Sequence, residues 1–329
     1  MPRIFVTFPP DSRANYYGEK AQHGLRALGD LRLNDEPRAL TAAEVIAAAA
    51  DCEFIVSDRQ TVGDAEIFRR LPKLIAFSRC AMDIRNVDVA AASQSGVLVT
   101  RASAGFVASV AEWVIGAMID LSRHISAAVR IYRAGEMPVP TMGRELRGST
   151  LGVIGYGQIG RYLCELGLGM RMHVRVYDPN AKVENSAVQQ SGLDELLENS
   201  DYVVCLAPAL SATENLMNAG AFRKMQPSAF FINASRGELV DEAALTLALD
   251  EGWIAGCALD VGRDPDQMPS RALARHARVI ATPHIAGLTP PAVEHQALET
   301  VRQIAEILAG RIPAGAVNFE HATRLARLT

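Results

Sequence analysis

The chain lacks paired cysteines, a strong charge bias and any long apolar run. Its five cysteines, Cys52, Cys80, Cys164, Cys205 and Cys257, form no C-x-x-C pair, which is typical of a reducing compartment and offers no metal-site spacing. The formal net charge is only −4, without a basic stripe, so nucleic acid is not expected as a partner. No apolar run approaches the roughly 18 residues that a membrane helix needs, and the first residues do not resemble a signal peptide. We therefore expect a cytoplasmic protein that binds no metal and no membrane.

Apolar residues make up 49% of the 329-residue chain, which is enough for two domains of ordinary size. In the first hundred residues, short runs of β-branched and aromatic residues alternate with helical patterns. Helices are predicted over 42–50, with Thr41 as N-cap, and over 87–95. The predicted strands are 4–8, 31–33, 54–56, 74–77 and 97–100. Such alternation predicts a parallel sheet that is covered on both faces.

The second half of the chain repeats this alternation after a long helical pattern over 103–134. The predicted strands are 151–154, 174–177, 202–206, 229–232, 256–259 and 279–281. Six strands suffice for a doubly wound sheet of their own, and a last helix is predicted over 291–309. The predicted fold class is therefore α/β, with two doubly wound parallel-sheet domains.

The stretch "LGVIGYGQIG" places Gly155, Gly157 and Gly160 in a G-x-G-x-x-G pattern between a predicted strand and a helix over 158–170. In that context Gly155 makes the tight turn, Gly157 lets the backbone approach a pyrophosphate, and Gly160 lets helix and strand pack closely. The N–H groups of the first helical residues, which include Gln158 and Ile159, would hold the pyrophosphate. The pattern predicts a dinucleotide site.

An acidic residue follows the next predicted strand, at the distance where a ribose-binding acid belongs. Asp178, in "VYDP", can accept hydrogen bonds from both ribose hydroxyls and would repel a 2′-phosphate. NAD is therefore favoured over NADP as the cofactor. The nearby cations Arg175 and Lys182 leave some use of NADP open.

Two more polar residues follow predicted strands of the same sheet. Arg236 lies in "FINASRGELVD" and His284 lies in "IATPHIAGLTPP". Ligands of open α/β sheets bind at the carboxyl ends of the strands. An arginine there can hold a carboxylate with two hydrogen bonds, and a histidine can exchange a proton near neutral pH.

From about residue 72 to 318 the sequence resembles the D-isomer-specific 2-hydroxyacid dehydrogenases. The resemblance is carried by "ELRGSTLGVIGYGQIGRYL", "VYDP", "MQPSAFFINASRGELVDEAAL", "GCALDV" and "VIATPHIAGLT". It implies a Rossmann NAD-binding domain over 103–284. It also implies a flavodoxin-like substrate-binding domain made from 1–102 and 285–329, and a homodimer formed through the region 103–134.

The resemblance also assigns roles to single residues. It implies that Arg236 binds the substrate carboxylate and polarises the keto group. It implies that His284 exchanges the proton while hydride moves between nicotinamide C4 and substrate C2. Asp260 would lie near the nicotinamide amide. The cofactor cleft would be lined by Ala207 or Pro208 and by Ala234.

The loop "GRDPDQ" departs from the family pattern, which has a glutamate before a proline as the partner of the histidine. Here Asp264 precedes the proline in a loop that is one residue shorter. Asp264 is the predicted partner of His284. Asp266, an amide such as Gln267, or a solvated turn without any partner remain alternatives. The roles of Arg79 and Arg101, in the N-terminal domain, stay open.

We therefore expect an oxidoreductase that transfers a hydride between NAD(H) and a D-2-hydroxy acid and 2-oxo acid pair. The sequence identifies neither the substrate side chain nor the physiological direction. The alternative is an NAD-sensing, corepressor-like binding protein of the same superfamily, for which assembly rather than turnover is the output.

Overall fold

The computed structural model describes residues 1–328, apart from the side chain of Asp266. The chain divides into two compact units. Unit 1 combines Met1–Phe106 with the segment that begins at Thr289, and unit 2 is Val107–Leu288. The boundaries expected from the sequence, after residues 102 and 284, lie close to these divisions.

Unit 1 is built on a parallel sheet in which all neighbouring strands run the same way. The strand order is β2-β1-β3-β4-β5, which is the flavodoxin-like order. The strands are β1 (Arg3–Val6), β2 (Asp30–Leu33), β3 (Phe54–Ser57), β4 (Ala76–Arg79) and β5 (Leu98–Arg101).

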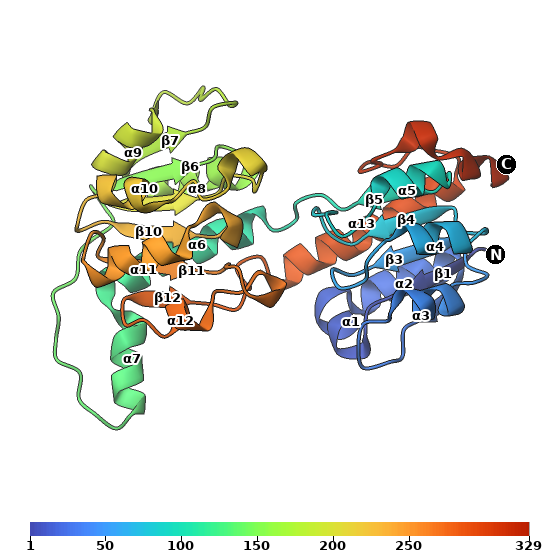
Figure 1. Cartoon of the computed structure of the whole chain (residues 1–329), viewed down its shortest axis with the longest axis horizontal. Helices are drawn as coiled ribbons and strands as arrows, with labels where there is room; N and C mark the ends of the chain where they lie inside the picture. Colours follow the sequence, from blue (N-terminus) through green and yellow to red (C-terminus); the bar gives the residue numbers. More distant parts are fainter. Residues whose placement is uncertain (329) are drawn as a thin grey trace. The chain divides into compact units, whose positions relative to one another are not determined.

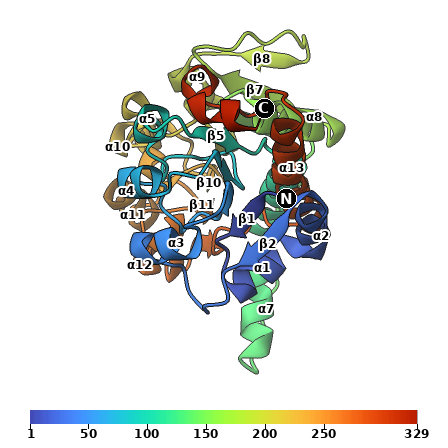
Figure 2. The ribbon, with the colours of Figure 1, turned by 90° about the vertical axis from the view of Figure 1, so that its right-hand side faces the viewer.

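Helices cover both faces of the unit 1 sheet. They are α1 (Pro10–Tyr16), α2 (Gly18–Leu28), α3 (Ala42–Ala48), α4 (Ala65–Arg70), α5 (Val89–Gln94) and α13 (Pro290–Leu308). One core lies between the sheet and α2 with α13, and the other lies under α3, α4 and α5. Figure 2 shows α13, from the end of the chain, beside α2 from its beginning. The predicted N-cap Thr41 is present, because its hydroxyl accepts the Glu44 N–H in a capping box.

Unit 2 is built on a parallel sheet with the order β12-β11-β10-β9-β6-β7-β8 (Figure 1). This is the strand order of dinucleotide-binding domains, with β12 added at one edge. The strands are β6 (Thr150–Ile154), β7 (His173–Tyr177), β8 (Val188–Gln190), β9 (Tyr202–Cys205), β10 (Phe230–Asn233), β11 (Gly256–Leu259) and β12 (Val279–Ala281). The edge strand β8 was not predicted, because its three residues include two exposed glutamines. The predicted fold class of two parallel-sheet α/β domains is confirmed.

The helices of unit 2 also form two layers. They are α6 (Val107–Arg123), α7 (Ile125–Arg133), α8 (Gln158–Gly169), α9 (Leu193–Asn199), α10 (Ala219–Lys224), α11 (Glu242–Asp250) and α12 (Arg271–Ala274). Helices α6 and α8 pack on one face of the sheet. Helices α9, α10 and α11 pack on the other. Short 3-10 turns follow β9, β10 and β11 at Ser211–Thr213, Gly237–Leu239 and Pro265–Gln267, and two more lie near the C-terminus at Phe319–His321 and Thr323–Arg327.

The single helix predicted over 103–134 is wrong, because the chain breaks it at His124. That residue has a left-handed φ of 56°, and the Asp120 carboxylate accepts the Ser126 N–H in the next turn. Helix α7 therefore starts in a new direction, and none of its residues is buried. In Figure 1, α7 and the loop after it project from the rest of unit 2.

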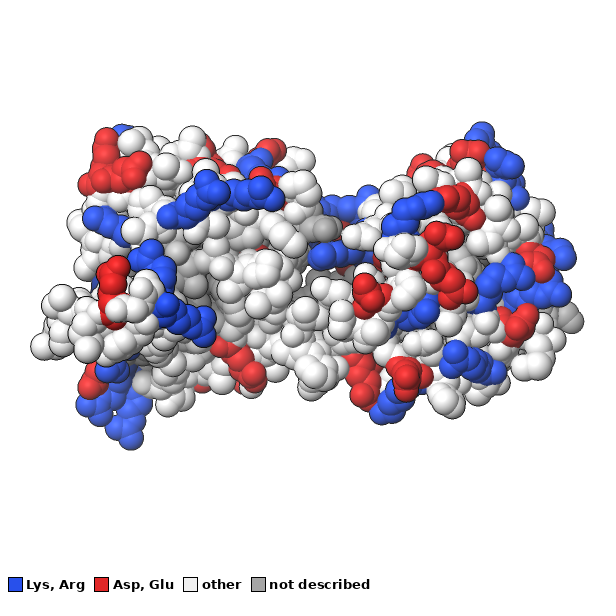
Figure 3. All heavy atoms as spheres, turned by 90° about the horizontal axis from the view of Figure 1, so that it is seen from below, with Lys and Arg blue, Asp and Glu red and all other residues white. Residues whose placement is uncertain are grey.

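Charged side chains of both signs are interspersed on the face of each unit that Figure 3 shows. This mixed pattern agrees with the small formal net charge of −4. Among the described residues, no helix combines the length and the apolar character that a membrane crossing demands.

Candidate nucleotide-binding and active site

The glycine-rich turn lies where the strand order of unit 2 reverses, between β6 and β9. Gly155 follows β6 with a φ of 101°, a conformation that side chains rarely adopt. A Cβ on Gly155 would lie 2.8 Å from the backbone nitrogen of Ala207, which follows β9. Gly155 is therefore needed both for the turn and for the close approach of the two loops. Such a switch point is where open α/β sheets bind ligands.

The next two glycines differ in what surrounds them. A Cβ on Gly160 would lie 2.2 Å from the Gly155 carbonyl oxygen, whereas a Cβ on Gly157 would meet nothing within 4 Å. Gly157 is the N-cap of α8, and the first N–H groups of the helix, at Gln158 and Ile159, have no acceptor within it. Open space therefore faces donors that have no acceptor within the helix, at its positive end, and this arrangement fits a pyrophosphate.

Asp178 follows β7 and is anchored to the same turn. Its Oδ2 accepts the Tyr156 N–H at 2.8 Å, and its Oδ1 accepts the N–H groups of Asn180 and Ala181 at 2.8 and 2.9 Å. Burial acts to raise the pKa of Asp178, but these three hydrogen bonds and the nearby Arg161 charge outweigh it and lower the pKa. The group is therefore a fixed anion beside the glycine turn.

The cation Arg175, which left NADP use open, is paired within unit 2. Its guanidinium donates to the Glu195 carboxylate at 2.9 Å. Lys182 is exposed.

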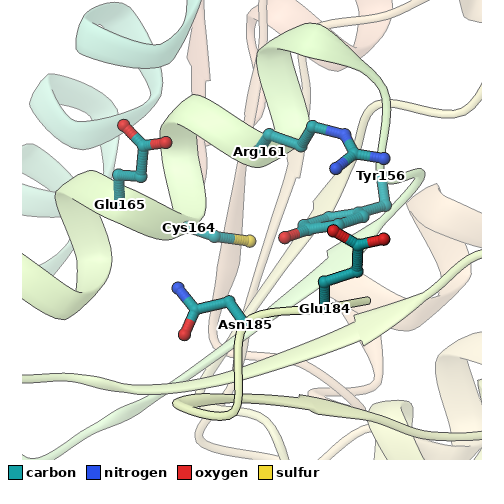
Figure 4. Close-up of a pocket in the computed structure, with 6 residues that line it drawn as sticks. All are labelled: Tyr156, Arg161, Cys164, Glu165, Glu184 and Asn185. Atoms are coloured by element: carbon teal, nitrogen blue, oxygen red, sulfur yellow. The ribbon is translucent and has the colours of Figure 1, made fainter. Parts of the chain in front are cut away.

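A cavity of about 200 Å³ lies beside the glycine turn and α8 and is shown in Figure 4. The Arg161 guanidinium covers the Tyr156 ring at 4.4 Å from its centroid, and Figure 4 shows the two stacked at one side. Burial raises the pKa of the Cys164 thiol to about 12, so this sulfur is a neutral thiol. The cavity is lined by Tyr156, Arg161, Cys164, Glu165, Glu184 and Asn185.

The loops after β9 and β10 are joined by a side chain that sequence reasoning did not single out for this role. The Ser235 hydroxyl donates to the Ala207 carbonyl oxygen at 2.6 Å. Ala207 is buried, Ala234 is half-buried and Pro208 is exposed. These three predicted cofactor-lining residues therefore lie on two loops that are tied together beside the glycine turn.

Arg236 begins the short turn after β10 and is held by its neighbours. Its carbonyl oxygen accepts the Asn233 side-chain amide at 2.9 Å, and its guanidinium donates to the Ser235 carbonyl at 2.7 Å. A Cβ on Gly237 would lie 2.1 Å from the Gly262 carbonyl oxygen, so the loops after β10 and β11 touch at this point. Arg236 therefore lies at the carboxyl edge of the sheet, as predicted.

His284 lies on the loop after β12, and Asp260 holds that loop. The Asp260 carboxylate accepts the Thr282 hydroxyl at 2.6 Å and the N–H groups of Ile285 and Ala286, each at 2.8 Å. The Asp260 carbonyl oxygen accepts the His284 N–H at 3.0 Å. Asp260 is 2% exposed, so its contact with a nicotinamide amide remains a prediction beside a clear structural role.

Asp264, the predicted partner of His284, is hydrogen-bonded within its own loop. Within the part of the chain that the structure describes, no hydrogen bond or ion pair joins them, and the Asp264 N–H donates to the Met268 carbonyl instead. The shortened loop closes on itself through that bond. The alternative Asp266 has a side chain outside the described part. The alternative Gln267 donates its amide to Glu238 at 3.4 Å.

The two arginines of unit 1 that stayed open differ in burial. Arg79 ends β4 with 5% of its surface exposed. Its guanidinium donates to the Asn86 side chain at 3.3 Å and to the Ser57 carbonyl at 3.4 Å, and burial lowers its pKa. Arg101 is exposed. Arg79 therefore helps to hold the ends of β3 and β4 together through its side chain, whereas Arg101 is bound through its backbone, to the Gly315 carbonyl and the Gln303 amide.

Comparison with known proteins agrees with this geometry. Residues 115–286 match the NAD-binding domain of the D-isomer-specific 2-hydroxyacid dehydrogenases. A glyoxylate reductase of Thermofilum pendens is 33% identical over 266 residues, which is 78% of each chain. A D-3-phosphoglycerate dehydrogenase of Archaeoglobus fulgidus is 34% identical over 284 residues, and the match covers 85% of this chain but only 54% of that protein.

A solved structure agrees as well. The structure of a putative D-isomer-specific 2-hydroxyacid dehydrogenase from a Polaromonas species superposes with a TM-score of 0.88, covering 96% of this chain and 99% of that one. At 22% identity this likeness shows the fold alone. The family match is to an NAD-binding domain, so the NAD cofactor predicted from the sequence is confirmed. With a match over half of the chain and a relative one-third identical over most of both proteins, the chain belongs to the D-isomer-specific 2-hydroxyacid dehydrogenase family.

Proposed function

We propose that the protein interconverts a 2-oxo acid and the corresponding D-2-hydroxy acid, with NADH as the hydride donor for reduction and NAD as the acceptor for oxidation. The observation that carries this proposal is the common location of three features at the carboxyl edge of the unit 2 sheet. The glycine turn follows β6, Arg236 follows β10 and His284 follows β12. Bound NADH supplies the hydride for reduction.

Residues of the chain bind the substrate, transfer the proton and hold the cofactor. Arg236 binds the substrate carboxylate with its planar guanidinium and draws electron density from the keto oxygen. His284 gives a proton to that oxygen during reduction and takes it back during oxidation. The N–H groups of Gln158 and Ile159 hold the pyrophosphate, and Asp178 accepts from the adenosine ribose.

The names of the relatives suggest which acids to test first. The glyoxylate reductase and this chain cover each other equally, whereas this chain spans about half the length of the D-3-phosphoglycerate dehydrogenase. We infer a small 2-oxo acid of the glyoxylate type as the substrate.

The test is NADH oxidation by the whole protein with glyoxylate, pyruvate, hydroxypyruvate and 3-phosphohydroxypyruvate. We expect turnover of at least one small 2-oxo acid, and its loss in Arg236→Gln with NADH binding retained. Tight NADH binding without turnover of any acid would favour the NAD-sensing alternative. A change of oligomeric state on adding NADH would then identify assembly as the output.

We also propose that the protein is a homodimer through α7 and the loop after it, and that it acts in the cytoplasm. Helix α7 presents Ile125, Val129 and Tyr132 on one face, and Tyr132 is 59% exposed. The following loop adds Met137 and Met142, which are 79% and 94% exposed. Apolar surface of this extent is typical of an interface, and a second copy would supply a matching face. The cytoplasmic location is supported by five free, buried cysteines.

Light scattering on a sizing column tests the dimer. We expect twice the chain mass for the parent protein and the single chain mass for Val129→Glu. Glu112→Gln on α6, whose side chain is exposed, is the control and should remain dimeric. A monomeric parent at micromolar concentration would refute the proposal.

A further inference from the structure

Two buried polar residues stand at the carboxyl ends of neighbouring strands in unit 2. Asn233 is the last residue of β10 and Asp260 follows β11, and they are 1% and 2% exposed. Burying an amide or a carboxylate is costly unless its hydrogen bonds are made. The hydrogen-bond partners of these two side chains therefore indicate their structural role.

Asn233 closes the turn that carries Arg236. Its side-chain oxygen accepts the Ser235 N–H at 3.1 Å, and its amide donates to the Arg236 carbonyl oxygen at 2.9 Å. One side chain thus fixes the backbone on both sides of the Ser235–Arg236 peptide. The direction in which the Arg236 side chain leaves the sheet follows from that turn.

Asp260 does the same for the loop that carries His284. Its carboxylate binds three donors, the Thr282 hydroxyl before His284 and the N–H groups of Ile285 and Ala286 after it. His284 itself has a left-handed φ of 55°. A non-glycine residue adopts that conformation uncommonly, and the three bonds to Asp260 hold the backbone on both sides of His284 in it here.

The backbones of the two residues are also hydrogen-bonded to each other. The Asp260 N–H donates to the Asn233 carbonyl oxygen at 3.1 Å, and His284 donates its own N–H to the Asp260 carbonyl oxygen at 3.0 Å. A continuous chain of hydrogen bonds therefore runs from the Arg236 turn through Asn233 and Asp260 to the His284 loop.

We propose that Asn233 and Asp260 form one positioning unit that sets how Arg236 and His284 face a common substrate. The inference rests on the proposed function for the roles of Arg236 and His284. It does not require a further ligand, and it gives Asp260 a task besides the predicted contact with nicotinamide. Neither residue is a catalytic residue in this proposal, because each acts through a neighbour.

Substitutions of Asp260 and of Asn233 should have distinguishable effects on catalysis. Asp260→Asn keeps the shape but turns one acceptor oxygen into a donor, so at least one of the three loop bonds is lost. The histidine then delivers its proton from a poorer position, and we expect kcat to fall about 100-fold with little change in KM. Asn233→Ala frees the Arg236 turn, and we expect KM for the 2-oxo acid to rise about tenfold with a smaller change in kcat.

Amide hydrogen exchange on the whole protein supplies a readout that does not depend on activity. Asp260→Asn should speed exchange at Ile285 and Ala286, and Asn233→Ala should speed it at Ser235. The matched controls are Asp201→Asn, whose carboxylate accepts the Thr150 N–H at the opposite end of the sheet, and Asn218→Ala, which caps α10. Both controls should keep kcat and KM near the parent values.

The outcomes separate the two proposals. Faster exchange at 285–286 without any turnover in the parent would refute the proposed function while supporting Asp260 as the holder of the loop. Unchanged exchange there, or activity within about threefold of the parent in Asp260→Asn, would overturn the positioning unit. Equal losses in Asp260→Asn and Asp201→Asn would also overturn it, because general destabilisation would then explain the effect.

Discussion

The two sheets of this protein share parallel strands and a central switch in strand order, but their first turns differ in chemistry. After β1 the chain reads Thr7-Phe8-Pro9-Pro10, and α1 begins at Pro10 with Pro9 as its N-cap. Prolines have no N–H group, so the start of α1 lacks two donors that could hold an anion. After β6 the chain instead places Gly155, Gly157 and Gly160 before the open donors of α8.

The strands beside these turns differ in the same way. In unit 1, Asn34 follows β2 and donates its amide to the Thr7 carbonyl oxygen at 2.9 Å. At the corresponding place in unit 2, Asp178 follows β7 and accepts the Tyr156 N–H at 2.8 Å. One position closes the turn with a neutral donor, whereas the other adds a fixed negative charge. The fold alone therefore does not make a nucleotide site, and a few residues at the strand ends do.

The largest effect on activity is expected from Arg236, which lies at the carboxyl edge of the unit 2 sheet, and it is compared with Arg101, which ends β5 of unit 1. Arg236→Ala should lower kcat/KM for the 2-oxo acid by about two to four decades, because a substrate carboxylate in a desolvated site loses its partner. Arg236→Lys should recover little, since a point charge does not reproduce the planar fork. Arg101→Ala in unit 1, where the side chain is exposed, is the control. Near-parent kcat/KM in Arg236→Ala would refute its role.

The glycines of unit 2 allow a test in which stability and binding separate. Gly160→Ala places a methyl group 2.2 Å from the Gly155 carbonyl, and overpacking of this kind costs about 1–3 kcal/mol of unfolding free energy. Gly157→Ala meets nothing within 4 Å, so the fold should keep its stability while the methyl group blocks the pyrophosphate. We expect the NADH dissociation constant to rise at least tenfold in Gly157→Ala with an unchanged melting temperature.

Thermal melting and fluorescence titration with NADH measure these two effects. If Gly157→Ala bound NADH like the parent, the pyrophosphate would not lie over this turn. If Gly160→Ala melted like the parent, the close contact with Gly155 would be relaxed at no cost, and the assignment of the third glycine to packing would fail.

How much of this could be read from the sequence depends on how local each signal is. The glycine spacing, Asp178, Arg236 and His284 all follow strands, and a strand end is a local pattern that predicts the carboxyl edge of a parallel sheet. The break at His124 was missed because no glycine or proline stands at the junction between α6 and α7, so their apolar positions follow one another as in a single helix. The roles of Asn233 and Asp260 were not visible, since their hydrogen bonds join loops after three different strands.

A smaller effect is expected when unit 2 is made to resemble unit 1 at the end of its second strand. Asp178→Asn places an amide where unit 1 has Asn34, so one of the three N–H donors around the carboxylate would face another donor. We expect NAD to bind about ten- to a hundredfold more weakly, while NADP binds no worse because the repulsion of its 2′-phosphate is gone. Dissociation constants for both cofactors test this, and a parent that prefers NADP would contradict the role of Asp178.

The depressed pKa of Asp178 gives the same residue a pH signature. The pKa of Asp178 in the folded protein lies below its ordinary value, so the stabilisation is fully present above that ordinary value and is lost as the pH falls through the folded pKa. The parent should therefore lose more stability than Asp178→Asn on acidification through this acid range. Parallel acid denaturation curves for the two proteins would show that the hydrogen bonds to Asp178 do not lower its pKa.

The smallest effect is expected at Asp264, where the comparison lies within a single loop. Asp260 and Asp264 are four positions apart, yet one carboxylate is buried with three donors and the other makes no hydrogen bond or ion pair with His284 in the described part of the chain. A carboxylate partner would favour protonated histidine and extend activity well above its ordinary pKa of about 6.5. Because no hydrogen bond or ion pair joins Asp264 to His284 among the described residues, Asp264→Asn should leave the pH profile of kcat/KM for reduction superimposable on that of the parent. The measurement is the alkaline limb of that profile, with Asp194→Asn on the exposed start of α9 as the control. A downward shift of the limb in Asp264→Asn alone would restore Asp264 as the partner of His284. It would also mean that the loop closed by the Asp264–Met268 backbone bond opens in the complex with substrate.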